Sequence, residues 1–217
     1  MGTGAIITAA VLLLAGLLFF ERRERSVLGL AAKAPLSCLF ILAALLQPRP
    51  EPGYAWLMLA GLVFCLGGDV FLALPQERMF LFGLVSFLIG HVFYVAAFFA
   101  LAQLNLWTWV GLASSLAVGA AVFRWLRPHL GKMFGPVIAY MVVISLMAVG
   151  AWTVFGAERL ASPGRALVLA GALCFYVSDI FVARNRFVKP DLSNRLIGLP
   201  LYYAGQFLLA FSVGRII

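Results

Sequence analysis

The chain is dominated by long stretches of apolar residues, and their length is the feature that most restricts its fold. A helix rises about 1.5 Å per residue, so roughly 20 residues cross the hydrocarbon core of a bilayer. Eight stretches of about that length occur in the sequence, at 4–20, 27–46, 54–74, 79–101, 106–123, 135–156, 166–183 and 196–213. The sequence therefore predicts an all-α, polytopic membrane protein with eight transmembrane helices.

The connections between these stretches are short and polar, so little chain is left to form anything outside a membrane. Of the 217 residues, 64% are hydrophobic and only 11% are charged, unlike the composition of a soluble domain. The first stretch is followed, not preceded, by the charges of ERRER at 21–25, and we interpret it as a retained helix rather than a signal peptide. We expect a single transmembrane domain, 1–217, with any chemistry located between helices.

The basic residues predict how the helices are oriented. With eight spans, both termini should lie on the same side of the membrane. The loops on the opposite side, together with the nearby Lys33, hold all but four of the 16 basic residues. Cytoplasmic loops are enriched in Lys and Arg, so we expect both termini on the non-cytoplasmic side. Topology and contact with anionic lipids then explain the net charge of +8, without nucleic-acid binding. The residues expected at the cytoplasmic side are Arg22, Arg23, Arg25, Lys33, Arg78, Arg124, Arg127, Lys132, Arg184, Arg186, Lys189 and Arg195, and the exceptions are Arg49, Arg159, Arg165 and Arg215.

Two acidic residues, Asp69 and Asp179, fall inside predicted spans, whereas the others fall in loops or at span ends. Each lies about five residues before the cytoplasmic end of its span, so both are expected roughly 7–8 Å from that boundary. A charged group at mid-helix costs about 2.5–3.5 kcal/mol on insertion scales, which makes such a carboxylate a candidate functional group. The alternative is a structural role, in which each Asp caps a helix or pairs with an arginine such as Arg78 or Arg184.

The surroundings of the two aspartates are similar, which indicates an internal repeat. GDVFLAL at 68–74 matches SDIFVAR at 178–184, and LIGHVFY at 88–94 matches LIGLPLY at 196–202. Four spans separate the equivalent positions, so both repeats would have the same orientation. We expect two parallel four-helix halves, 1–105 and 106–217, whose symmetry could bring the two carboxylates face to face.

Further polar side chains can reach the same leaflet in pairs that share one helix face. These pairs are His91 with Tyr94, Tyr176 with Asp179, and Tyr202 with Gln206, three or four residues apart. We regard all of them as candidate substrate-binding residues. The alternatives are a neutral histidine satisfied by a neighbouring helix and tyrosines of the interfacial aromatic belt.

The sequence offers no familiar metal site. Cys38, Cys65 and Cys174 lie in separate spans without a CxxC pair, and we interpret them as packing residues. His91 and His129 are too few for a three-histidine zinc site. We therefore expect neither a metal ion nor an organic cofactor, although Asp and Glu ligands leave the metal question open.

Four segments resemble the bacterial YhhN-like membrane proteins, whose animal relatives are lysoplasmalogenases. They are GDVFLAL at 68–74, FGLVSFLIGHVFY at 82–94, YVSDIFVARNRF at 176–187 and YYAGQFLLA at 202–210, whereas the first, second, fifth and sixth spans carry no matching motif. The resemblance implies a bacterial inner-membrane hydrolase that cleaves the vinyl ether bond of lysoplasmalogens, giving a fatty aldehyde and a glycerophospho-alcohol. It also implies that Asp69 and Asp179 are the catalytic pair.

The chemistry of a vinyl ether fits two carboxyl groups. Its hydrolysis begins with protonation on carbon, and water then captures the resulting oxocarbenium ion. Two carboxyl groups in one apolar pocket can divide these tasks, one as a protonated acid and the other as an ionised base, as in glycoside hydrolysis. No metal is needed, and the sequence leaves open which aspartate has which task.

The expected substrate is a lysophospholipid-like amphiphile with its alkenyl chain between helices. Its phosphate would lie near Arg184, Arg186 or Lys189, and tyrosine faces such as that of Tyr202 could hold a choline or ethanolamine ammonium group. The competing interpretation is a lipid or solute transporter that uses the paired acids for proton coupling. The headgroup and the oligomeric state are not predicted.

Overall fold

A computed structural model describes the backbone of residues 2–23 and 26–217, and the side chains of these residues except 26–31 and 77. Within this range the chain forms eight α-helices: α1 (Thr3–Arg22), α2 (Ser26–Leu45), α3 (Pro52–Ala73), α4 (Glu77–Leu101), α5 (Leu106–Leu126), α6 (Phe134–Phe155), α7 (Ser162–Ala183) and α8 (Leu192–Ser212). Two short turns, Arg127–His129 and Gly131–Met133, join α5 to α6, and a π-helical turn, η3 (Arg184–Val188), follows α7. The predicted all-α fold is confirmed; Arg25 lies outside the described residues.

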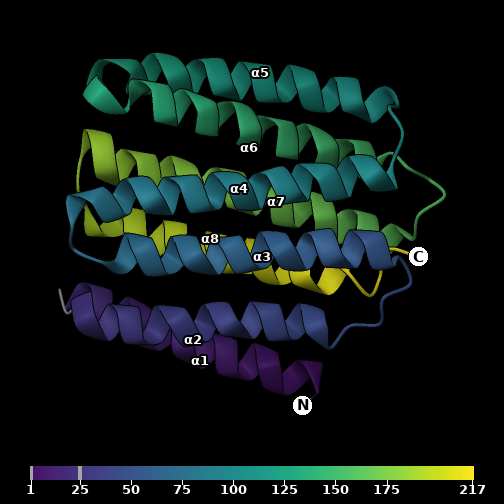
Figure 1. Cartoon of the computed structure of the whole chain (residues 1–217), viewed down its shortest axis with the longest axis horizontal. Helices are drawn as coiled ribbons and strands as arrows, with labels where there is room; N and C mark the ends of the chain where they lie inside the picture. The colour runs from purple at the N-terminus through teal and green to yellow at the C-terminus, as the bar shows by residue number, and fades with distance from the viewer. Residues whose placement is uncertain (1, 24–25) are drawn as a thin grey trace.

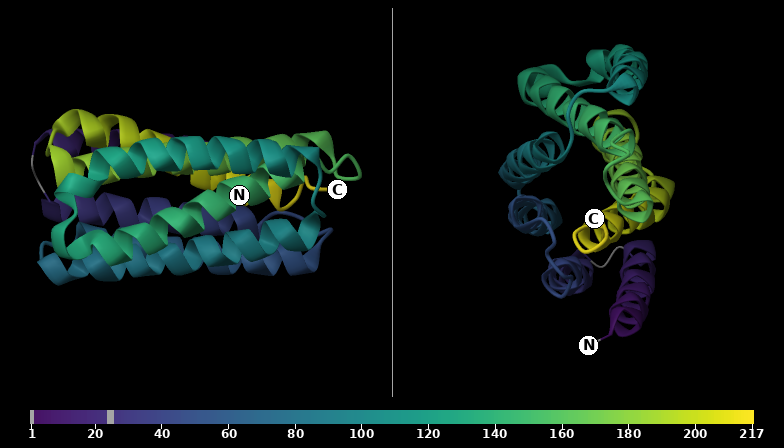
Figure 2. Two further views of the ribbon diagram at one scale, coloured as in Figure 1. Left: turned by 90° about the horizontal axis from the view of Figure 1, so that it is seen from above. Right: turned by 90° about the vertical axis from the view of Figure 1, so that its right-hand side faces the viewer.

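The helices run roughly along one direction and form two rows (Figures 1 and 2). One row holds α2, α3 and α4, and the other holds α1, α8 and α7. Helix α6 contacts both α4 and α7, and α5 packs against α6. The most extensive contacts are those of α3 with α4 and of α7 with α8, so the two helices that carry the intramembrane aspartates each pair with their successor.

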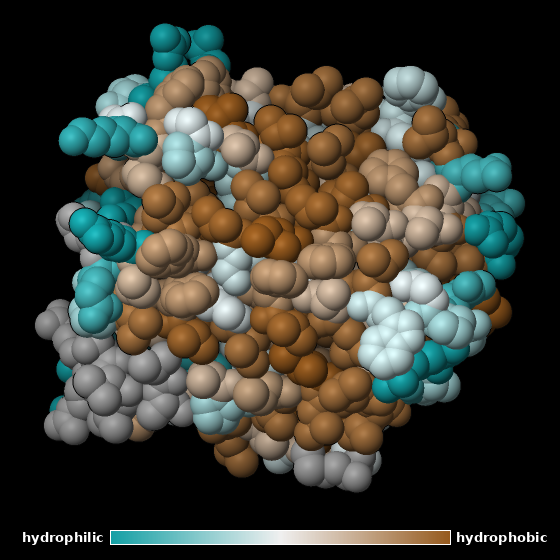
Figure 3. Space-filling model, viewed as in Figure 1, coloured by the Kyte–Doolittle hydropathy of each residue, from teal (hydrophilic) through white to brown (hydrophobic). Residues whose placement is uncertain are grey.

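The surface of the bundle is apolar across its middle and polar at both ends (Figure 3). Six segments of the described chain are long and apolar enough to cross a membrane, so this is an integral membrane protein. They are Thr3–Arg22, Pro52–Ala73, Arg78–Leu101, Leu106–His129, Gly131–Phe155 and Ser162–Val188. The apolar helix at Ala32–Leu45 is shorter. Helix α8 is more polar because it carries side chains that are buried inside the bundle, namely Asn194, Tyr202, Tyr203, Gln206 and Ser212.

Glycines allow the closest helix contacts. A Cβ at Gly205 of α8 would lie 2.8 Å from the carbonyl oxygen of Gly171 in α7, and one at Gly90 of α4 would lie 3.0 Å from that of Gly61 in α3. Small residues let helix backbones approach in this way in membranes, where apolar burial alone gives little attraction between helices. These contacts fix the α3–α4 and α7–α8 helix pairs, in which α3 carries Asp69 and α7 carries Asp179.

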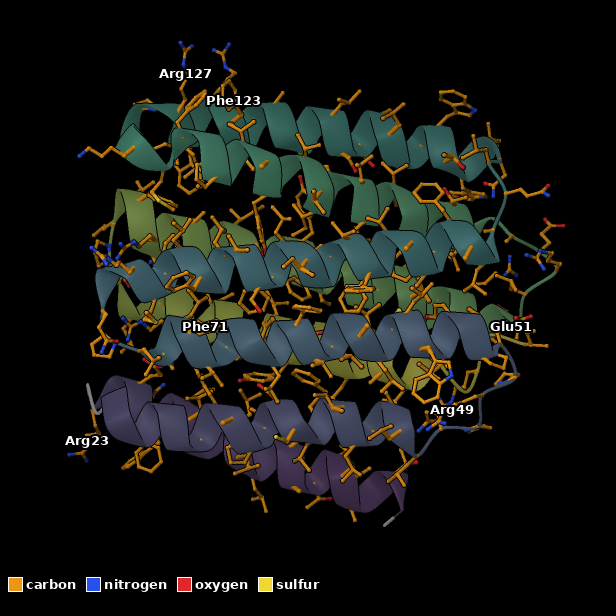
Figure 4. All side chains as sticks on the ribbon, viewed as in Figure 1. Arg23, Arg49, Glu51, Phe71, Phe123 and Arg127 are labelled. Atoms are coloured by element: carbon orange, nitrogen blue, oxygen red, sulfur yellow. The ribbon has the colours of Figure 1, made fainter. Side chains whose placement is uncertain are left out.

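The two ends of the bundle differ in their charged residues. Figure 4 shows Arg23 and Arg127 at one end, and Arg49 and Glu51 at the other. Both chain termini lie at the same end as Arg49 (Figure 1). Arg23 and Arg127, which are expected on one side of the membrane, therefore share one end of the bundle, and Arg49, which is expected on the other side, lies at the opposite end.

The connection between α7 and α8 is held by side-chain hydrogen bonds. Asp191 begins α8 by accepting a hydrogen bond from the backbone N–H of Ser193 at 2.8 Å, and hydrogen bonds from Ser193 lower the pKa of this carboxyl. Asn194 is buried, and its Nδ2 donates to the carbonyl oxygen of Lys189 at 3.0 Å. The Arg184 guanidinium donates to Oδ1 of Asn194. These hydrogen bonds fix the conformation of the connection between α7 and α8 at the basic end of the bundle.

Candidate active site

Asp69 lies on α3 where three helices meet, and only 4% of its surface is exposed. Its Oδ2 accepts one hydrogen bond from the hydroxyl of Ser37 on α2 and another from the hydroxyl of Tyr202 on α8, each at 2.6 Å. Burial of a carboxylate is tolerable when donors replace the lost water in this way. Tyr202, which the sequence predicts as a substrate-binding residue, thus donates a hydrogen bond to Asp69. Its contact with substrate stays a prediction.

Two further hydrogen bonds orient the hydroxyl of Tyr202. Nε2 of Gln206, one turn further along α8, donates to the Tyr202 hydroxyl at 3.2 Å. The Tyr94 hydroxyl of α4 in turn donates to Oε1 of Gln206 at 2.8 Å. The Tyr202 hydroxyl therefore has both a donor and an acceptor, and its orientation toward Asp69 is fixed by residues from α4 and α8.

Asp179 lies on α7 and is half-buried. Its Oδ2 accepts a hydrogen bond from the hydroxyl of Tyr140, which α6 contributes. Each of the two aspartates thus has one oxygen held by a tyrosine hydroxyl. Among the residues that the structure describes, none donates a hydrogen bond to Oδ1 of either carboxyl group.

A narrow apolar cavity of about 80 Å³ reaches Asp179. Helices α4, α6 and α7 supply most of its wall, and Asp179, Tyr140 and Tyr176 contribute its polar groups. Its volume is small beside the roughly 300–1,000 Å³ of pockets for drug-sized ligands, and its wall is mostly apolar. The lining residues are Leu72, Phe80, Leu84, Phe87, Val122, Leu126, Val137, Tyr140, Met141, Ile144, Tyr176, Asp179, Ile180, Val182, Ala183 and Phe187.

Aromatic rings connect the surroundings of the two carboxyl groups. Tyr202 meets Phe175 with ring centroids 5.1 Å apart, Phe175 meets His91 at 4.6 Å, and His91 meets Tyr140 at 5.3 Å, all edge to face. The residues around Asp69 and those around Asp179 are thus linked by one cluster of aromatic rings, in which the ring of His91 contacts both Phe175 and Tyr140.

The structural alternative of an ion pair for each aspartate is wrong for the described residues. Within 4.0 Å, the ion pairs among them are Lys189 with Asp191 and Arg195 with Glu21. Neither Asp69 nor Asp179 has a cationic partner at that distance. Lys33 lies one turn before Ser37 on α2 and makes no ion pair with Asp69 within 4.0 Å.

The predicted substrate-binding residues divide into two groups. His91, Tyr94, Tyr202 and Gln206 lie in the hydrogen-bonded and aromatic surroundings of the aspartates, and Tyr176 lines the cavity, with its hydroxyl 3.3 Å from Oγ of Ser145. Arg184 instead directs one guanidinium nitrogen to Asn194, at the end of the bundle. Its predicted contact with substrate stays a prediction.

Sequence reasoning missed Ser37 and Tyr140, because it found no motif in the second and sixth spans. Both are hydroxyl side chains inside apolar segments, and that was the only signal of their role. Three or more His, Cys, Asp or Glu side chains do not gather anywhere in the described part of the chain.

Comparisons with known proteins identify relatives. The model of the YhhN family matches residues 28–213. The human protein named lysoplasmalogenase TMEM86A is 33% identical over 187 residues, which make up 82% of this chain and 74% of that relative. A Mycobacterium tuberculosis protein named lysoplasmalogenase is 31% identical over 206 residues, covering 90% of this chain and 74% of its own. An Escherichia coli protein named uncharacterized membrane protein YhhN is 23% identical over 181 residues, covering 82% and 84%. No solved structure matches the chain significantly.

Proposed function

Because this chain belongs to the YhhN family, in which relatives about one-third identical to it are named lysoplasmalogenases, we propose that it hydrolyses the vinyl ether bond of lysoplasmalogens. The products are a fatty aldehyde and a glycerophospho-alcohol. Asp69 and Asp179 are the acid and base, and the reaction uses neither a metal ion nor an organic cofactor. The observation that carries the proposal is the pair of aspartates, each held by a tyrosine hydroxyl, with Asp179 on the wall of an apolar cavity.

The two carboxyl groups can return to their starting states in one turnover. The protonated carboxyl transfers its proton to the β-carbon of the vinyl ether, and the α-carbon becomes an oxocarbenium centre. Water adds to this carbon while the second carboxylate takes a proton from the water, which gives a hemiacetal. The first carboxylate then removes the hemiacetal hydroxyl proton as the second carboxyl protonates the departing glycerol oxygen. One water is consumed, and the C–O bond breaks to give aldehyde and alcohol.

The surroundings of the two aspartates favour different tasks. Asp179 lines the cavity that would hold the alkenyl chain, so its carboxyl group is the better placed to protonate carbon. Asp69 accepts two hydroxyl hydrogen bonds on one oxygen, a pattern that suits an ionised carboxylate. We therefore assign Asp179 as the acid of the first step and Asp69 as the base that activates water.

The basic end of the bundle suits the substrate phosphate. The guanidinium of Arg186 in η3 lies 4.5 Å from the centroid of the Phe80 ring, and Phe80 and Phe187 line the cavity. Arg184 is partly engaged by Asn194, whereas Arg186 is exposed. An amphiphile with its chain in the cavity would therefore place its phosphate near Arg186, with Arg184 and Lys189 as further candidates.

We also propose that all eight helices cross the membrane as two parallel repeats, with the basic end in the cytoplasm of a bacterium. Beyond Arg195, the polar side chains of helix α8, namely Tyr202, Tyr203, Gln206 and Ser212, are buried in the bundle, which supports its crossing. The repeats are supported by spacing: Gly61 precedes Asp69 and Gly171 precedes Asp179 by the same interval. The positive end containing Arg23 and Arg127 supports the orientation.

The proposal is tested by measuring aldehyde release from 1-alkenyl lysophosphatidylethanolamine with purified protein in detergent. The saturated 1-alkyl ether is the matched control, because it has the same shape but no double bond to protonate. We expect release from the vinyl ether alone. No release from folded protein, with either ethanolamine or choline headgroups, would contradict the hydrolase and favour lipid binding or proton-coupled transport.

A further inference from the structure

His91 has one ring nitrogen satisfied and the other left without a partner. Its Nδ1 lies 2.6 Å from the carbonyl oxygen of Phe87, one turn earlier on α4. A carbonyl oxygen can only accept, so Nδ1 carries the hydrogen and Nε2 of the neutral ring is an acceptor. His91 is fully buried, and Nε2 has no hydrogen-bond partner among the described residues.

An unpartnered acceptor in the core of a membrane protein needs an explanation. Leaving such a group unsatisfied destabilises the fold, and native proteins rarely contain one. Only one other buried side-chain atom in the described chain, Nε of Arg165, is in this state, and that guanidinium donates elsewhere, from Nη1 to the Phe155 carbonyl oxygen. The Nε2 atom of His91 can therefore accept a hydrogen bond from a donor that enters with the reactants.

The position of His91 indicates which donor that would be. Phe87, one turn before His91, lines the cavity, so His91 lies about 6 Å further into the bundle. Its ring is 5.3 Å from that of Tyr140, which holds Asp179, and 4.6 Å from that of Phe175, one turn before Asp179. The His91 ring itself does not line the cavity, but it lies in the packed core next to Phe87 and Tyr140, which line the cavity together with Asp179.

We propose that Nε2 of His91 accepts a hydrogen bond from an O–H group of the reactants and so orients it beside Asp179. This inference rests on the proposed function. Two reactant groups have the required chemistry: the free glycerol hydroxyl of a lysolipid and the water that adds to the oxocarbenium carbon. In the first case His91 selects lipids with an unmodified hydroxyl, since a site built to bind a hydroxyl rejects analogues that lack it. In the second it orients the nucleophile.

The test combines two substrates with matched variants. The substrates are 1-alkenyl lysophosphatidylethanolamine and its 2-O-methyl ether, which cannot donate. The variants are His91→Phe, which removes the acceptor, His91→Gln, which restores one, and His129→Phe, a change of the exposed histidine after α5. For each variant, we would measure the turnover of both substrates and the thermal stability in detergent. We expect His91→Phe to lower kcat/KM for the lysolipid by about 10- to 100-fold without lowering Tm, and His91→Gln to recover part of it.

The substrates distinguish the two sources of the donor. If the glycerol hydroxyl is the donor, methylation lowers wild-type turnover and His91→Phe adds no further loss with the methylated lipid. If water is the donor, His91→Phe lowers turnover of both lipids by the same factor. Activity of His91→Phe within about twofold of wild type on the lysolipid, or a loss that matches a fall in Tm, would overturn the inference. Absence of turnover by the wild type would instead reject the proposed hydrolase, and the role of His91 with it.

Discussion

The hydroxyl of Tyr202 donates a 2.6 Å hydrogen bond to Oδ2 of Asp69, and the two residues are 133 positions apart in the sequence. Tyr140 makes the corresponding bond to Oδ2 of Asp179. The donors come from α8 and α6, and the carboxyl groups from α3 and α7. The α3–α4 pair is thereby tied to Tyr202 of α8, and the α7–α8 pair to Tyr140 of α6. One oxygen of each carboxyl group has no hydrogen-bond donor among the described residues.

The first prediction concerns the two aspartates. Asp69→Asn and Asp179→Asn should each lower kcat by at least about 100-fold, because an amide of the same shape cannot exchange a proton at neutral pH. The amide oxygen can still accept from Tyr202 or Tyr140, so thermal stability in detergent should stay near that of the wild type. Variants that are folded and retain most of their activity would remove these residues from the mechanism.

The second prediction concerns the tyrosine that holds Asp179. Tyr140→Phe removes the hydroxyl and should reduce kcat by about 10-fold or more, in line with hydrogen bonds to charged groups. Tyr54→Phe is the matched control, since Tyr54 is also buried and its hydroxyl lies 2.5 Å from Oγ of Ser212, with no contact to either aspartate. Equal loss in both variants would indicate that Tyr140 acts on stability alone.

Much of this fold could be predicted because the bilayer sets the length of each apolar stretch. The eight helices begin and end within a few residues of the predicted spans. The burial of Asp69 and Asp179 inside helices could be predicted from the apolar stretches around them, and carboxyl groups are rare in such segments; their catalytic role stays a prediction. Ser37 and Tyr140 could not, because single hydroxyl residues are common in apolar helices, and which helix faces meet depends on tertiary packing. The unpartnered nitrogen of His91 is likewise visible only in three dimensions.

The third prediction concerns the close contact of α7 and α8. Gly205→Ala should destabilise the protein by about 1–3 kcal/mol, because the new Cβ would lie 2.8 Å from the backbone oxygen of Gly171, which cannot move aside alone. Gly16→Ala is the control, as no atom lies within 4 Å of its Cβ position in α1. It should leave stability unchanged or raise it slightly, by up to about 1 kcal/mol. Thermal unfolding in detergent compares the two, and equal stabilities would contradict the close contact.

The fourth prediction concerns the substrate phosphate. Arg186→Gln should raise KM by about 3- to 10-fold and change kcat little, because the guanidinium is expected to bind a part of the lipid far from the reacting bond. Arg127→Gln removes an exposed arginine at the same end of the bundle and serves as the control for general attraction of anionic lipid. Equal effects of the two substitutions would point to surface charge rather than to a phosphate site.

The last prediction concerns orientation in the membrane. Arg127 and Arg49 lie at opposite ends of the bundle, so cysteines placed there should react with a membrane-impermeant thiol reagent from opposite sides (Figure 4). If the basic end is cytoplasmic, Arg49→Cys is labelled in intact cells and Arg127→Cys only in inverted vesicles. The unmodified protein is the control: its three cysteines lie within helices, but Cys38 is exposed and Cys174 is partly exposed, so their labelling is measured and subtracted. Labelling of Arg127→Cys in intact cells would reverse the topology and place both aspartates in the outer leaflet, where a lysolipid would have to approach from outside the cell.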